Sequence, residues 1–150
     1  MMDLRNGVLE IDDQLLTPNI TPDSVEEKFG KYVTYQNAID PLTTIYLDDV
    51  LLFGVKFQLR LSFKNRKLRY IKMESQREKM PWKKAFELDC LWLKEQLGEP
   101  DHVARTDESS GSYAARYSNT YYGKGCMISS SYEDDLRCGE DANITINYEE

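Results

Sequence analysis

The groups that could do chemistry in this 150-residue chain are one histidine, three cysteines and several acidic doublets. Nucleophilic catalysis needs a cysteine or serine beside a positioned base. The single imidazole, His102, follows "GEP" in a polar segment, whereas the periodicity around Cys90 turns that thiol toward a core. We therefore expect no catalytic centre and interpret the chain as a non-enzyme.

Motifs for metals and cofactors are also missing from the sequence. Cys126 and Cys138 are separated by twelve positions with no second pair, which does not fit a zinc site. The glycines in "GKGC" and "FGVK" lack the spacing of a phosphate-binding loop. The doublets at 12–13 and 48–49 do not continue as alternating oxygen ligands, so we interpret them as solvated turns. The sequence predicts neither a metal nor a cofactor.

The densest charge lies at the C-terminal end of the chain. Residues 129–150 carry seven carboxylates and one base, Arg137, within a chain whose net charge is -7. An acidic surface attracts a basic partner, and tyrosine supplies rigid contact area. The residues that we assign to partner binding are Tyr132, Glu133, Asp134, Asp135, Glu140 and Asp141. The alternative is a solvated turn, with the contact made elsewhere, for example by Leu88 and Leu91.

A second charged block, residues 56–94, holds twelve bases and four acids. Its lysines and arginines gather around one predicted hairpin, where Tyr70 could stack on a base. The overall acidity, with a pI of about 4.8, argues against nucleic acid as the partner. We expect a protein partner, and the oligomeric state is left open.

The composition is that of one soluble domain spanning residues 1–150. Hydrophobic residues make up 41% and charged residues 30%, and no stretch approaches the roughly 20 apolar residues of a membrane span. The first residues, "MMDLRNGVLEIDD", lack the basic and apolar regions of an export signal, so a cytoplasmic location and free thiols are expected.

The elements that must position these groups follow from hydrophobic periodicity. We expect a first strand over 7–12, a helix over 22–29 capped by Thr21, and a strand that turns at 48–49. Alternation predicts a central hairpin over 57–63 and 68–73, with a bulge where Leu68 falls out of phase. A main helix runs from Pro81 to the stop at Gly98, a polar loop follows, and three strands close the chain.

This order of elements predicts an α+β fold. Consecutive antiparallel strands interrupted by two helices favour a two-layer sandwich in which both helices cover one face of the sheet. Asp89 falls on the buried arc of the main helix and would need a partner there.

The layout "LTPNITPDSVEEKFG", "FGVKFQLRLSFKNRKLRYIKM", "WKKAFELDCLWLKEQLGEPD" and "NITINY" resembles small bacterial cytoplasmic proteins. Its layering is similar to β-lactamase inhibitor protein and to small outer-membrane assembly lipoproteins, whose export signal and lipobox cysteine it lacks. It also resembles immunity proteins, including those of contact-dependent growth inhibition. The resemblance implies that the chain neutralises a toxin domain, such as a nuclease, by covering a basic cleft. The alternative is a structural or envelope-associated interaction module.

Overall fold

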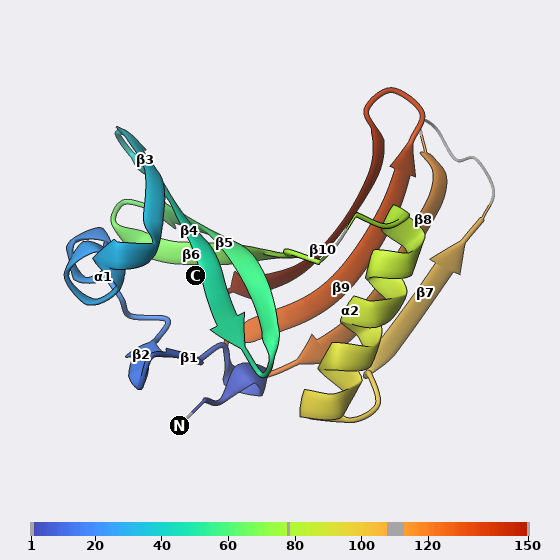
Figure 1. Ribbon diagram of the computed structural model, residues 1–150, viewed down its shortest axis with the longest axis horizontal. Helices are drawn as coiled ribbons and strands as arrows, with labels where there is room; N and C mark the ends of the chain where they lie inside the picture. Colours follow the sequence, from blue (N-terminus) through green and yellow to red (C-terminus); the bar gives the residue numbers. More distant parts are fainter. Residues whose placement is uncertain (1, 78, 108–112, 150) are drawn as a thin grey trace.

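The computed structural model describes residues 2–77, 79–107 and 113–149. These residues form an eight-stranded antiparallel sheet, a separate two-stranded ribbon and two α-helices (Figure 1). The strand order in the large sheet is β3-β4-β5-β6-β10-β9-β8-β7. The expected α+β class with an antiparallel sheet is therefore confirmed.

The bounds of the elements follow the chain. They are η1 (Leu4–Asn6), β1 (Leu9–Ile11), β2 (Gln14–Leu16), α1 (Pro22–Phe29), η2 (Gly30–Tyr32), β3 (Val33–Ile39), β4 (Leu42–Leu52), β5 (Val55–Lys64), β6 (Lys67–Ser75), α2 (Trp82–Leu97), β7 (His102–Thr106), β8 (Tyr113–Tyr122), β9 (Cys126–Asp135) and β10 (Gly139–Tyr148).

Alternation along the strands separates the large sheet into an apolar and a polar set of side chains. One row crosses six strands by direct pairing and is fully buried: Ile45, Leu61, Ile71, Ile146, Ile128 and Tyr121. The adjacent row of paired residues points to the opposite side of the sheet. It is polar and consists of Tyr46, Arg60, Lys72, Thr145, Ser129 and Thr120. We call the surface made by this second set the polar face.

The two helices form where the sequence predicts them, and they lie near opposite ends of the sheet (Figure 1). α1 begins at Pro22, and the Thr21 side chain accepts a hydrogen bond from the Ser24 N–H at 3.3 Å. It buries Val25 and Phe29 and contacts β4. The expected helix over 22–29 is confirmed.

α2 packs on β9 and β10 and ends at Gly98, where φ is 83°. Its buried side chains include Phe86, Trp92 and Leu93, and the Trp92 ring meets Phe57 edge-on at a centroid distance of 5.0 Å. Trp82, the first residue of α2, is 44% exposed.

Asp89 lies inside the apolar side of α2 with 1% exposure, and its Oδ1 atom is buried without a hydrogen bond from any described residue. The Arg77 guanidinium lies 3.7 Å from its carboxylate. Burial raises the pKa of Asp89 to about 6, while Ser75 and Arg77 act in the opposite direction. The helix therefore carries a buried carboxylate that resists ionisation.

Three expectations about strands need correction. β4 runs through the predicted turn at 48–49, where a bulge with Asp49 at φ 59° absorbs one residue, and the chain reverses at Phe53 and Gly54 instead. The predicted first strand is shorter, β1, and it pairs with β2 outside the large sheet. The predicted loop after α2 contains β7, which pairs with β8. The bulge expected near Leu68 is confirmed by the register shift between β5 and β6.

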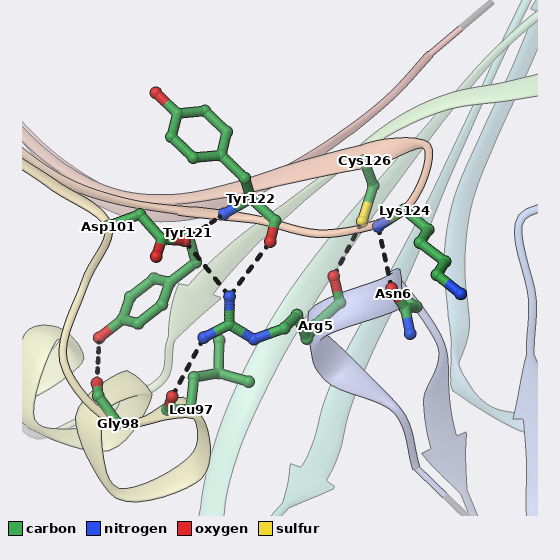
Figure 2. Close-up of polar contacts among 9 residues, drawn as sticks. All are labelled: Arg5, Asn6, Leu97, Gly98, Asp101, Tyr121, Tyr122, Lys124 and Cys126. Atoms are coloured by element: carbon green, nitrogen blue, oxygen red, sulfur yellow. Dashed lines mark hydrogen bonds and ion pairs between the residues drawn. The ribbon is translucent and has the colours of Figure 1, made fainter.

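Arg5 connects the start of the chain to the end of α2 (Figure 2). Its guanidinium donates to the carbonyl oxygens of Leu97 (3.2 Å) and Tyr122 (3.1 Å) and to the Asp101 carboxylate (3.2 Å). Asp101 also accepts from the Tyr122 N–H at 2.9 Å, which lowers the pKa of this carboxyl group. A single side chain thus joins η1, the α2 terminus and the end of β8.

The backbone at this junction is packed too closely for a larger residue. A Cβ atom added at Gly123 would lie 1.7 Å from the Arg5 carbonyl oxygen, which also accepts a hydrogen bond from the Cys126 thiol at 3.2 Å. Lys124 donates its backbone N–H to the Asn6 side chain at 2.9 Å. Glycine at 123 is therefore required by close approach between two segments far apart in sequence.

Candidate functional site

The acidic residues predicted to bind a partner lie in the β9–β10 hairpin, which stands at one end of the molecule (Figure 1). Its three-residue loop, Leu136 to Cys138, is followed by Gly139 at φ 90°, the left-handed conformation that closes such a hairpin. The Asp135 carboxylate accepts from the N–H groups of Arg137 (2.8 Å) and Cys138 (3.3 Å). These contacts, chiefly the Arg137 N–H, lower the pKa of Asp135 and order the loop.

The register of the hairpin places carboxylates opposite each other. Glu133 pairs with Asp141, and Asp134 pairs with Glu140 on the next rung. Side chains on successive rungs point to opposite sides of a sheet, so the two acidic pairs lie on different faces. We call the five carboxylates Glu133, Asp134, Asp135, Glu140 and Asp141 the acidic ladder.

Basic side chains accompany the pair on the polar face. Arg116 lies 3.4 Å from Glu133, and Lys72 lies 3.6 Å from Asp141. Arg137 lies 3.7 Å from Asp135 near the loop. Part of the charge that the sequence concentrates in this segment is therefore neutralised by bases from β6, β8 and the loop.

The pair on the other face is different. Among the described residues, neither Asp134 nor Glu140 forms an ion pair. Glu140 accepts a hydrogen bond from the Tyr132 hydroxyl at 2.7 Å. Two carboxylates opposed on adjacent strands are destabilising, and here neither is joined to a described base by an ion pair.

Tyr132, which the sequence analysis assigns to partner binding, is buried. It is 5% exposed and packs with Phe86 of α2 and Tyr117 of β8, with centroid distances of 6.2 Å and 5.3 Å. Burial, followed by the hydrogen bond to Glu140, raises its pKa. Its role in this structure is to support Glu140 from the core.

The histidine and the cysteines, which could act as bases, nucleophiles or metal ligands, lie in different elements of the structure. His102 pairs with Thr120 on the polar face of the edge strand β7, whereas the half-buried Cys90 thiol contacts Ser130 at 3.6 Å on the opposite face. Cys126 is buried and Cys138 is exposed in the hairpin loop. Within the described ranges, no group of three or more histidine, cysteine and acidic side chains is arranged to hold a metal.

A hollow of about 260 Å³ adjoins the acidic ladder on the polar face. Its lining includes Arg116, Ser118, Ser131 and Glu133. The sequence analysis did not assign Arg116 or Lys72 to the site. The signal that could have indicated them is the alternation of polar residues in β8 and β9, combined with the pairing register.

The alternative contact residues on α2 have mixed exposure. Leu91 is 52% exposed and lies beside a depression that also includes Val103 and Pro100, whereas Leu88 is half-buried. Leu91 therefore remains accessible at the α2–β7 side of the molecule.

Comparisons with protein-family models, with characterised proteins and with solved structures find no significant match to the chain. Neither described α-helix combines the length and the apolar character needed to cross a membrane.

Proposed function

We propose that this protein is a non-enzymatic, immunity-type protein that binds a basic protein domain through the acidic ladder. The observation that carries the proposal is the opposition of Asp134 and Glu140 without a basic partner among the described residues. Like charges directly opposite in a β-ladder oppose folding. A lysine or arginine from a partner would offset that repulsion when the complex forms.

The surroundings of the pair favour binding over a passive turn. Tyr132 holds the Glu140 carboxylate at 2.7 Å, and the ring cluster with Phe86 and Tyr117 holds Tyr132. A pre-ordered carboxylate loses less side-chain entropy on binding than a mobile one. Glu140 itself is exposed, so a partner can reach it.

The partner that this charge pattern suits is a toxin domain with a basic cleft, such as a nuclease, in the cytoplasm. Nucleases bind phosphates through lysine and arginine side chains. Carboxylates spaced along two strands can occupy the same basic side chains and exclude the substrate. Electrostatic attraction would also accelerate the encounter and make it sensitive to salt.

The arrangement of the layers is consistent with this role. We infer a two-layer organisation with both helices on the apolar side, because α1, α2 and the apolar row contribute to one hydrophobic core. The polar face would then present Glu133, Asp141 and the hollow at Arg116 for contact, whereas Asp134 and Glu140 would be reached from the α2 side of the hairpin.

The test is a capture experiment with paired baits. The full chain and its Asp134→Asn/Glu140→Gln variant are incubated with extract from the native cells and washed at low and high salt. We expect the wild-type bait alone to retain a basic protein, which high salt releases. That protein, expressed alone, should arrest growth, and co-expression of the wild-type chain should restore growth.

The matched control is Asp13→Asn/Glu27→Gln, which removes the same charge from two exposed sites outside the hairpin. It should behave as the wild type does. Equal capture by the hairpin variant would exclude Asp134 and Glu140 from the interface. A captured protein that is harmless to growth would contradict the immunity role and leave only binding.

A further inference from the structure

The edge strand β3 has little of the protection that an exposed sheet edge usually has: a bulge interrupts its start between Val33 and Tyr35, and the ladder from Tyr35 to Ile39 is regular. It is the first strand of the sheet and pairs only with β4. Its sequence, VTYQNAI, contains no charge and no proline, and six of its seven residues are exposed. Exposed edges with unpaired backbone groups are templates for another strand unless charge, proline, bulges or cover prevent it.

The opposite edge of the same sheet is protected. β7 has only five residues and includes His102 and Arg105. The Arg105 guanidinium donates to the Asn119 side chain at 2.8 Å and lies over the Phe86 ring at 5.1 Å. The contrast indicates that the exposure of β3 is a local feature and not a general property of this sheet.

We propose that β3 pairs antiparallel with β3 of a second copy of this chain, with Asn37 of each copy opposite the other at a two-fold axis. The register is set by the regular part of the strand, because a bulge interrupts the ladder between Val33 and Tyr35. In this register Tyr35 lies opposite Ile39 of the second copy, and Gln36 lies opposite Ala38.

Self-complementarity is the argument for a second copy as the occupant. Tyr35 is 52% exposed and Ile39 is 68% exposed, and both point to the same side of the strand. The two-fold axis at Asn37 brings them together twice, as aromatic and β-branched cross-strand pairs, which stabilise antiparallel ladders. An isologous contact of this kind uses the same patch on both copies and stops at two.

The absence of charge on β3 also favours a second copy of this chain as its partner. The whole chain has a net charge of -7, so two copies repel each other over most of their surfaces. β3 has no charge, and no like charges meet in the proposed ladder. A strand built for a partner of opposite charge would be expected to carry charge of its own.

The pairing should be weak. Five ladder residues per copy, with neighbouring Leu42 at 55% exposure, provide less area than the roughly 1,200 Å² of a standard stable interface. We expect a reversible dimer with a dissociation constant on the order of micromolar to millimolar.

Sedimentation of the full chain over a wide concentration range tests the proposal. The wild type should shift from the 17.5 kDa monomer toward a species of twice that mass. Asn37→Lys, which opposes two lysines at the axis, should raise the dissociation constant by up to about fivefold. The matched control, Val103→Lys, makes a comparable exposed change on the other edge and should leave association unchanged.

A cysteine pair tests the register. In a Cys138→Ser background, Asn37→Cys should oxidise to a covalent dimer, because directly opposed residues in antiparallel strands have Cα distances suited to a disulfide. Val103→Cys in the same background should not. Circular dichroism of each variant verifies folding.

Three outcomes would overturn the proposal. They are a monomer at the highest attainable concentration, equal association of the Asn37→Lys and Val103→Lys variants, and assembly into open-ended species larger than a dimer. None of these outcomes depends on the proposed toxin partner. If the dimer does not form, the proposed function of the acidic ladder is still tested separately by the capture experiment.

Discussion

Asp134 and Glu140 face each other in the β9–β10 ladder, and neither forms an ion pair with a basic side chain among the described residues. Neutralising both should stabilise the isolated chain, because it removes repulsion worth about 0.2–1 kcal/mol. We therefore expect Asp134→Asn/Glu140→Gln to raise the free energy of unfolding in urea by about that amount. Glutamine at 140 keeps an oxygen for the Tyr132 hydroxyl.

The control for this prediction is again Asp13→Asn/Glu27→Gln, which changes the net charge equally. It should alter the unfolding free energy less than the hairpin variant does. A loss of stability in the hairpin variant would show that the two carboxylates already serve the fold, and it would weaken the case for a partner.

The Arg5 contacts predict a measurable contribution to stability from the N-terminal segment. Arg5→Ala removes hydrogen bonds to Leu97, Tyr122 and Asp101. Because the Arg5 side chain is 38% exposed, we expect a loss of only about 1–2 kcal/mol in chemical denaturation. Lys124→Ala, a substitution of a nearby exposed base, should cost less than about 0.5 kcal/mol.

Close packing at Gly123 predicts that adding one methyl group there lowers the stability more than Arg5→Ala does. In Gly123→Ala the new methyl group would collide with the Arg5 carbonyl, so the two segments must separate. The expected loss exceeds about 2 kcal/mol, measured by thermal or urea unfolding.

Gly30→Ala provides the comparison for Gly123. The nearest atom to its Cβ would be a Glu26 carboxylate oxygen at 3.5 Å, and Gly30 has φ of -54°. Alanine accepts this conformation, so the change should be neutral or stabilising by up to about 1 kcal/mol. Similar losses at both positions would contradict the close approach at Gly123.

Asp89 predicts an unusual pH dependence of stability. Burial raises its pKa from 3.8 to about 6, so the folded chain holds this proton more tightly than the unfolded chain does. Between those two values the folded state binds more protons, and the contribution of Asp89 to the free energy of unfolding falls as pH rises. Above pH 6 its ionisation should cost about 3 kcal/mol, and below about pH 4 the cost disappears.

The measurement is urea unfolding of the wild type and Asp89→Asn between about pH 4 and pH 7. The stability difference, variant minus wild type, should increase with pH. A flat difference for Asp89→Asn would mean that Arg77 offsets the cost of burial. Exposed carboxylates such as Asp101, whose pKa is lowered, lose their stabilising contacts only below about pH 4.

The elements that the sequence predicted correctly are those whose signals are local. Thr21 and Pro22 begin α1, Gly98 ends α2, and alternation over 57–63 makes β5, because capping, backbone conformation and side-chain period act within a few residues. The mismatched phase at Leu68 likewise revealed its bulge before any pairing was known.

The elements that sequence analysis missed depend on pairing. β3 and β7 are exposed edge strands without a buried face of their own, so alternation is weak and only their neighbours define them as strands. β4 continues through Asp48 and Asp49 because a bulge accommodates the doublet, which resembles a turn in sequence.

The sequence by itself determined that the C-terminal segment is acidic and that the chain forms an antiparallel α+β fold, since charge and periodicity can be read locally. Only the tertiary structure decided how that acidity is divided. Register opposes Glu133 to Asp141 and Asp134 to Glu140, and strand pairing brings Arg116 to the first pair alone. A one-residue change in register would move every side chain of a strand to the other face of the sheet. The spacing in the sequence therefore could not show that Asp134 and Glu140 are the pair without a basic partner among the described residues.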